Sequence, residues 1–383
     1  VIAESETFAT AINSLDADSN VTFFADLGVL KQLPVFQKGL MKEQNPLVSL
    51  LFAPFLGAVK EATWVAAGVK ISDDDISIEV AANGAPEDAS DPGSFAWPQN
   101  PGDGAMPNLV VPRQIAGLSF YRDLHKFYGE KDALFPERTS GLIFFENMMG
   151  IFFSGRDLTE EVLGNTLPDI RIVVAEQEFK DPARTPTLQL PGFAAVVQIS
   201  DPENFSLVMK AAWQNAIGLV NTTSGQNAQP TLMIDADVHE GTKYTTSKFL
   251  FPAGIENSAG DGRFNAQPTI ATYGHYLIMS STEALTKDLI DVLKKEADTG
   301  AKPVGGKHSL AVLDAASLAS VLAVNRATMI RQNMVDKGVS REEAENEING
   351  IMMVLKYVRD LEIDAGVENG NAKMNVRVGY ELP

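Results

Sequence analysis

The sequence contains no cysteine among its 383 residues. That absence excludes disulfide bonds, thiolate metal sites and a cysteine nucleophile, although it does not fix the compartment. Positive charge is also scarce, because 31 lysines and arginines are set against 50 aspartates and glutamates, for a formal net charge of -19. Such a surface repels duplex nucleic acid and anionic membranes, so neither is an expected partner.

Long hydrophobic runs are missing as well. The longest, residues 47–59, is too short to span a bilayer and is interrupted by Pro54, so no transmembrane segment is expected. A buried core helix is the favoured interpretation, and a lipid-facing or self-associating helix is the alternative. The sequence starts at Val1 without a signal sequence, as expected if a signal peptide was removed or the chain was trimmed.

Sequence motifs of known reactions are absent. There is no phosphate or dinucleotide loop, no G-x-S-x-G elbow and no HExxH zinc motif. None of the four histidines is paired with another at metal-ligand spacing on a helix: His125, His239, His275 and His308. A protein without catalytic activity is therefore the first interpretation, and no catalytic or cofactor-binding residue is assigned.

The residues that are present favour an α+β fold. Apolar residues make up 45% and charged residues 21%, which suits a folded core, and the length favours two or three packed units. Alternating apolar and polar residues, broken by turn signals, predict paired strands. These pairs cover residues 63–80, 170–199, 232–251, 269–280 and 361–378. We expect antiparallel meander sheets with helices packed on one face.

Helices are predicted between the strand groups. Two aromatic-rich helices are expected over residues 117–128 and 140–153, and an amphipathic helix over 283–295. Three further helices are predicted from capping signals at their first residues. These signals are Asp157 with Glu160, Asp201 before Pro202, and Ser340 with Glu343.

The two ends of the chain share a pattern. Residues 21–26 and 309–314 each read as a strand ending in an aspartate, and each is followed by an apolar stretch and a hairpin. We therefore predict a repeated strand–helix–hairpin unit. The predicted organisation is an N-terminal unit at 1–84, a Pro/Gly-rich linker at 85–112, a central α+β unit at 113–300 and a similar C-terminal unit at 301–383. Phe95 and Trp97 are expected to anchor the linker.

The polar cluster best suited to metal binding or acid/base catalysis consists of Asp235, Asp237 and His239. They alternate along one predicted strand, so their side chains share a face. Two carboxylates and an imidazole would bind a divalent cation if further ligands completed the shell, or would act as an acid/base pair. The favoured interpretation is the solvated face of a half-buried strand, because any such strand shows this alternation.

Two acidic turns are weaker candidates for a cation. Residues 73–75 are three consecutive aspartates between two strands, and Asp16 and Asp18 resemble the first ligands of a calcium loop. Neither segment has the glycine or the bidentate glutamate of a helix–loop–helix calcium site. Both are interpreted as turns.

Six short runs carry a resemblance to a known group. They are LPGFAAVV at 190–197, DPE at 201–203, HEG at 239–241, YGHYLIMSS at 273–281, FFEN at 144–147 and FFSGRD at 152–157. With them the chain resembles uncharacterised planctomycete-type bacterial proteins that carry a domain of unknown function. The resemblance implies an exported, extracytoplasmic protein and implies no activity or functional residue.

Three hypotheses follow. The first is a non-enzymatic extracytoplasmic protein that binds a partner, self-associates or builds an envelope assembly. The second is a cation-binding protein or metal-assisted hydrolase that uses Asp235, Asp237 and His239 with a divalent cation. The third is a carrier of apolar ligands, which a deep apolar pocket between sheet and helices would favour.

Overall fold

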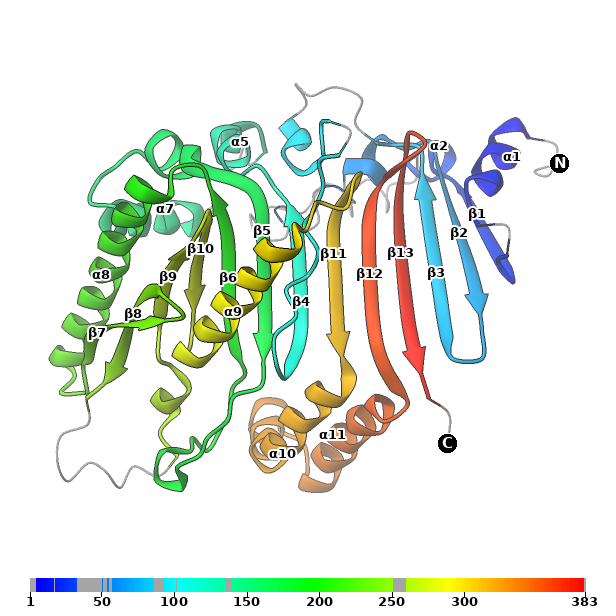
Figure 1. Ribbon diagram of the computed structural model, residues 1–383. Coiled ribbons are helices and arrows are strands. Elements are labelled where there is room, and N and C mark those ends of the chain that lie inside the picture. The colour runs from blue at the N-terminus through cyan, green and yellow to red at the C-terminus, as the bar shows by residue number, and fades with distance from the viewer. Residues whose placement is uncertain are drawn as a thin grey trace.

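The described residues form one antiparallel sheet of 13 strands, in the order β1-β2-β3-β13-β12-β11-β4-β5-β6-β10-β9-β8-β7 (Figure 1). The computed structural model describes residues 5–16, 18–32, 50, 54, 57–85, 92–100, 102–134, 140–250 and 260–381. The predicted α+β class with antiparallel sheet is confirmed. The apolar run 47–59 lies largely outside the described residues.

All of the predicted strand pairs form. In chain order the strands are β1 Val21–Asp26, β2 Trp64–Ile71, β3 Asp75–Ala82, β4 Gln114–Tyr121, β5 Thr166–Ala175, β6 Gly192–Ile199, β7 Leu232–His239, β8 Thr242–Phe249, β9 Thr269–Tyr273, β10 Tyr276–Ser280, β11 Lys307–Asp314, β12 Val358–Glu368 and β13 Asn371–Tyr380. Alternation of apolar and polar residues predicts a strand with one face more buried than the other, as in β2 and β5.

Helices connect the strands. They are α1 Glu6–Asn13, α2 Leu27–Leu30, α5 Leu124–Gly129, α6 Lys131–Leu134, α7 Ser140–Phe152, α8 Pro202–Gln226, α9 Glu283–Thr299, α10 Ala315–Lys337 and α11 Arg341–Leu355. Short turns of helix are η2 Pro92–Ala96, η3 Leu158–Val162, η4 Leu163–Asn165, η5 Pro182–Arg184 and η6 Gly262–Asn265. The three predicted capping signals are confirmed, because Asp157, Asp201 and Ser340 each accept a first-turn amide.

The predicted helix over residues 117–128 is wrong in its first half. Residues 114–121 form β4 between β11 and β5, and the helix α5 begins only after Asp123, whose side chain accepts the amide of Lys126. Burial along β4 alternates, with Ile115 and Phe120 on opposite faces. The aromatic residues fit a helix stripe as well as a strand, and here a period of two and a central position in the sheet decide for the strand.

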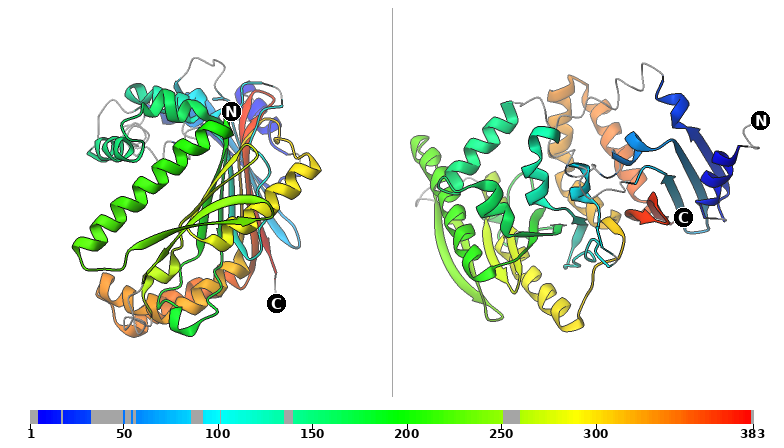
Figure 2. Two further views of the ribbon diagram at one scale, coloured as in Figure 1. Left: turned by 60° about the vertical axis from the view of Figure 1, so that its left-hand side comes forward. Right: turned by 90° about the horizontal axis from the view of Figure 1, so that it is seen from above.

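Helices cover both faces of the sheet around β6, β10 and β9, and not one face as predicted. On one side α9 places Leu289, Ile290 and Leu293 in a core with Ile278 of β10. The neighbouring residue of β10, Leu277, points to the other side and joins the core beneath α7 and α8. Figure 2 shows α8 lying obliquely across its side of the sheet.

The two chain ends meet in the sheet. Both ends follow the order strand, helix, hairpin, and β3 pairs with β13 over eight register positions. That the two ends are copies of one unit stays a prediction. In the predicted linker, Phe95 and Trp97 are 1% and 3% exposed, so they anchor the described part of this segment.

Candidate functional site

One sheet face runs continuously from α9 to the strands of the two chain ends. Directly paired residues of antiparallel strands share a face. The pairs lead in order through Ile278, Val196, Arg171, Ser119, Leu310, Asp364, Asn375 and Glu79. The face is therefore apolar where α9 covers it and polar on β12, β13 and β3.

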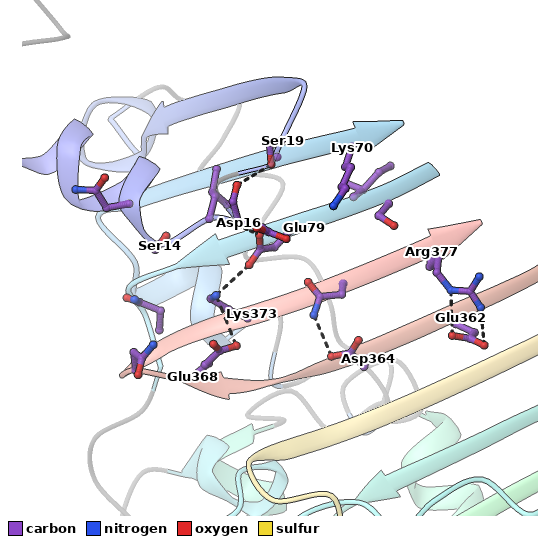
Figure 3. Close-up of a pocket in the computed structure, with 18 of the residues that line it drawn as sticks. Ser14, Asp16, Ser19, Lys70, Glu79, Glu362, Asp364, Glu368, Lys373 and Arg377 are labelled. Carbon is purple, nitrogen blue, oxygen red and sulfur yellow. Dashed lines mark hydrogen bonds and ion pairs between the residues drawn. The ribbon is translucent and has the colours of Figure 1, made fainter. Parts of the chain in front are cut away.

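A groove of about 890 Å³ lies on this polar part, between α1 and the strands β2, β3, β13 and β12 (Figure 3). Most of the described residues that line it are polar, and none of them is a histidine or an aromatic residue. Five carboxylates line it: Asp16, Glu79, Glu362, Asp364 and Glu368. Three cationic side chains line it as well: Lys70, Lys373 and Arg377.

Simple alternation in β13 places these charges on one face. Lys373, Asn375 and Arg377 point into the groove, while the residues between them, Met374 and Val376, point to the opposite face. The hairpin turn before β13 suits this arrangement, because Asn369 and Gly370 both have positive φ, at 51° and 77°. That turn closes β12 onto β13 without shifting the register.

Lys373 joins the two chain ends electrostatically. Its Nζ lies 3.0 Å from Glu79 Oε1 on β3 and 3.6 Å from Glu368 Oε2 on β12. The side chains of Lys373 and Glu79 are only 11% and 14% exposed. Burial alone would lower the pKa of Lys373, but the two carboxylates outweigh it and the pKa is raised. Glu79 also accepts the backbone amide of Asp16 at 2.6 Å, which ties the end of α1 to the sheet.

A second group of charges lies further along β12 and β13. Arg377 Nη2 lies 2.7 Å from Glu362 Oε1, and the hydrogen bond to Glu362 raises the pKa of Arg377. Asp364 pairs with Lys307 of β11 and accepts the Asn375 amide at 3.1 Å. Each cation in this row is held by a carboxylate on a neighbouring strand, so the charges are fixed in position.

This arrangement suits reversible binding better than covalent chemistry. Of the serines in the lining, Ser14 and Ser19 donate to backbone carbonyls, and Ser77 donates to the carboxylate of Asp75 at 3.2 Å. Most of the charged side chains in the lining are held in ion pairs, and an activated nucleophile needs a neighbouring base that is free to take its proton. The groove therefore offers fixed charges and hydrogen-bonding groups to a polar ligand.

The predicted cation ligands Asp235, Asp237 and His239 lie on β7, an edge strand, and share a face as expected. Asp235 and Asp237 are exposed and accept the amides of the residues that follow them, at 2.9 and 2.8 Å. His239 Nε2 contacts Asp291 Oδ1 of α9 at 2.8 Å. These three side chains are thus engaged with separate partners.

The described residues contain no group of three or more His, Cys, Asp or Glu side chains that would hold a metal ion. Metal binding at β7 stays a prediction, which metal analysis and melting scans with zinc or calcium would test. Of the acidic turns, residues 73 and 74 are exposed at the β2–β3 turn, and Asp16 lines the polar groove. Asp18 pairs with Lys70 at 3.4 Å.

Two buried arginines are not among the residues that the sequence singles out. Arg171 of β5 is 0% exposed, with Nη1 at 2.6 Å from Glu296 Oε2 and Nη2 at 3.6 Å from Asp169 Oδ2. Arg122 is 1% exposed and donates to the carbonyl of His308 and to Ser309 Oγ, both at 2.9 Å. A signal was present, since both arginines lie within or beside otherwise apolar strands, where a charge needs a buried partner.

Comparisons with known proteins leave the identity open. No family model matches the sequence, and no curated protein matches it. Among solved structures, crystal form I of TP0453 matches with 9% identity over 69% of this chain and 74% of that one. The TM-score is 0.23, so this likeness carries no argument. None of the helices in the described part is both long enough and apolar enough to cross a membrane.

Proposed function

We propose that the chain is a non-enzymatic extracytoplasmic binding protein that holds a polar partner bearing positive charges in the groove between α1 and the β2-β3-β13-β12 strands. The observation that carries the proposal is the charged lining of this groove. Its side chains are ordered by ion pairs across three strand boundaries. Such pre-ordered charge lowers the entropic cost of binding.

The sign of the charge indicates the partner. The lining has five carboxylates and three cations, an excess of two negative charges, and the whole chain carries -19. A cationic segment would be steered to this surface and would exchange lysine–carboxylate contacts within the groove for its own. The described residues of the lining include no aromatic ring, so we propose a ligand held by charge and hydrogen bonds and not by stacking.

The proposed location and the envelope role depend on the resemblance to exported planctomycete-type proteins. Cell fractionation with an antibody against the chain tests the location. Recovery with the cytoplasmic fraction would contradict it, and the groove proposal would then need a cytoplasmic partner.

The binding proposal is tested by titrating hexalysine and hexaglutamate into the protein at low and high salt. We expect hexalysine to bind and hexaglutamate not to bind, and we expect salt to weaken hexalysine binding, because groove contacts between exposed charges are screened. Glu362→Gln and Asp16→Asn should each weaken hexalysine by about two- to fivefold.

Glu160→Gln is the matched control, because Glu160 is 75% exposed, lies outside the groove and its substitution changes the net charge by the same amount. If hexalysine bound Glu362→Gln, Asp16→Asn and Glu160→Gln with equal affinity, its binding would depend only on the net charge of the protein. That result would contradict the groove as the binding site.

A further inference from the structure

The edge strand β7 has an apolar face that is left open. Ile234 and Val238 alternate with aspartates, a pattern that predicts burial of the apolar side chains. They are nevertheless 42% and 54% exposed, and Ala236 between them is also exposed. An apolar strand face that stays open at a sheet edge suggests that something other than the chain's own core covers it.

This open face is on the α8 side of the sheet. Ala236 pairs with Thr245, which pairs with Ile270, and Ile270 belongs to the core beneath α8. The helix contacts the sheet along much of its length. Phe205 and Ala212 are in that core, and Asn221 near the end of the helix exchanges hydrogen bonds with the backbone of Leu232 at 2.9 and 2.6 Å.

Along α8 and the strands β7, β8 and β9 there is a groove of about 660 Å³. Its volume falls within the usual range of small-molecule sites. Leu207 of α8 is 65% exposed and lines the groove together with Val238 and Ala236 of β7. The oblique course of α8 past these strands can be followed in Figure 2. The groove therefore has apolar side chains on both walls.

Two lysines line the same groove. Lys210 follows Leu207 by three residues, so both lie on one side of α8, and Lys243 is the cross-strand partner of Val238. Within the described part of the chain neither lysine has an ion-pair partner, although acidic residues far outnumber basic ones. Asp237 also borders the groove, but its carboxylate accepts from Tyr244 and from the amide of Val238.

We propose that this groove binds a single-chain anionic amphiphile, with the acyl chain against Leu207 and Val238 and the anionic head between Lys210 and Lys243. The apolar side chains on both walls would contact the acyl chain of the ligand, and the two lysine ammonium groups would pair with its negative head. A carboxylate and a phosphate head share this chemistry. The site is separate from the polar groove on the opposite face of the sheet, so the two binding proposals can be tested independently.

Calorimetric titration of the full chain with dodecanoate, dodecyl phosphate and dodecanol, all below their micelle concentrations, tests the site. We expect both anionic amphiphiles to bind more tightly than the alcohol, and the tighter of the two identifies the head group. Lys210→Ala with Lys243→Ala should weaken the anionic ligands by about fivefold or more and leave dodecanol unchanged. Leu207→Asp and Val238→Asp should each weaken all three by about tenfold or more.

The controls are Lys302→Ala and Val335→Asp, two exposed positions outside the groove. All the substituted side chains are on the surface, so melting temperatures should stay close to that of the wild type. Equal weakening by the control variants, no binding of either dodecanoate or dodecyl phosphate, or binding only to phosphatidylglycerol vesicles would each overturn the proposal. Retained dodecanoate binding in Leu207→Asp and Val238→Asp would place any amphiphile elsewhere.

Discussion

At the scale of single residues, the sheet buries two charged side chains, Asp169 and Arg171, whose removal from water costs free energy. Both oxygens of Asp169 and two nitrogens of Arg171 are buried without a hydrogen-bond partner among the described residues. Burial raises the pKa of Asp169 to about 6, against the opposing effect of Arg171 and with a further increase from Glu296. The carboxylate is thus held in its charged form at a cost.

The first prediction concerns Asp169→Asn. Because the pKa of the folded state lies above the ordinary value of 3.8, the stability from this group is present below about pH 4 and is lost as pH rises through 6. At pH 8 the neutral amide should stabilise the protein by up to about 3 kcal/mol, and at pH 4 it should give no gain. Urea unfolding of both proteins across this range measures the difference. Parallel stability curves would show that Asp169 is not the titrating group.

At the scale of elements, Asp235 and Asp237 protect the open edge of β7. Their carboxylates accept the amides of Ala236 and Val238, which would otherwise be available to a strand from another molecule. Exposed Met233 and Ile234 on the same strand would add to such an association. These hydrogen bonds give the two aspartates a role at the strand edge, and metal binding by them stays a prediction.

The second prediction follows from this protection. Asp235→Ala with Asp237→Ala should leave a monomer that associates as its concentration rises, which light scattering after size exclusion detects. Asp235→Asn with Asp237→Asn is the matched control, because each asparagine keeps an oxygen that can accept the amide. Association of the asparagine variant to the same extent would assign the effect to lost charge instead of lost capping.

The third prediction concerns the turns from strand to helix. Asp26, Asp123 and Asp314 each follow or end a strand and accept an amide in the first turn of the next helix. Asp314→Ala should destabilise the protein by about 1 kcal/mol, whereas Asp314→Asn should have little effect. Denaturant unfolding measures both. A loss as large in the asparagine variant would mean that charge, and not the hydrogen bond, stabilises α10.

These elements show what local sequence could predict. Hairpins such as β7–β8 and β12–β13 were predicted because period-two alternation and positive-φ turn residues act within a few positions. The strand β4 was missed because aromatic residues fit both helix and strand, and only its neighbours β11 and β5 decide. The polar groove was beyond local reasoning for the same reason, since its charges come from both ends of the chain.

At the scale of the whole molecule, the sheet makes the chain ends interdependent. The β3–β13 pairing joins residues that are separated by about three hundred positions, and loop closure over such a distance is a cost that the native contacts must offset. The predicted boundaries at 84, 112 and 300 fall along the chain, whereas the sheet runs across all of them. We expect the hairpins β2–β3 and β12–β13 to lose their protection from hydrogen exchange together.

Lys373 at the β3–β13 boundary provides the fourth prediction. Lys373→Glu would place three carboxylates together and should destabilise the protein by about 3 kcal/mol, because the pair with Glu79 is largely buried. Hydrogen exchange should accelerate in both β2–β3 and β12–β13 but not in β9–β10, which has its own core. The charge swap Glu79→Lys with Lys373→Glu should restore part of the protection, since it rebuilds the pair with reversed signs but leaves the new carboxylate at position 373 beside Glu368. If only β12–β13 opened in Lys373→Glu, the two ends would be independent, and the groove between them would be an adjustable site and not a fixed one.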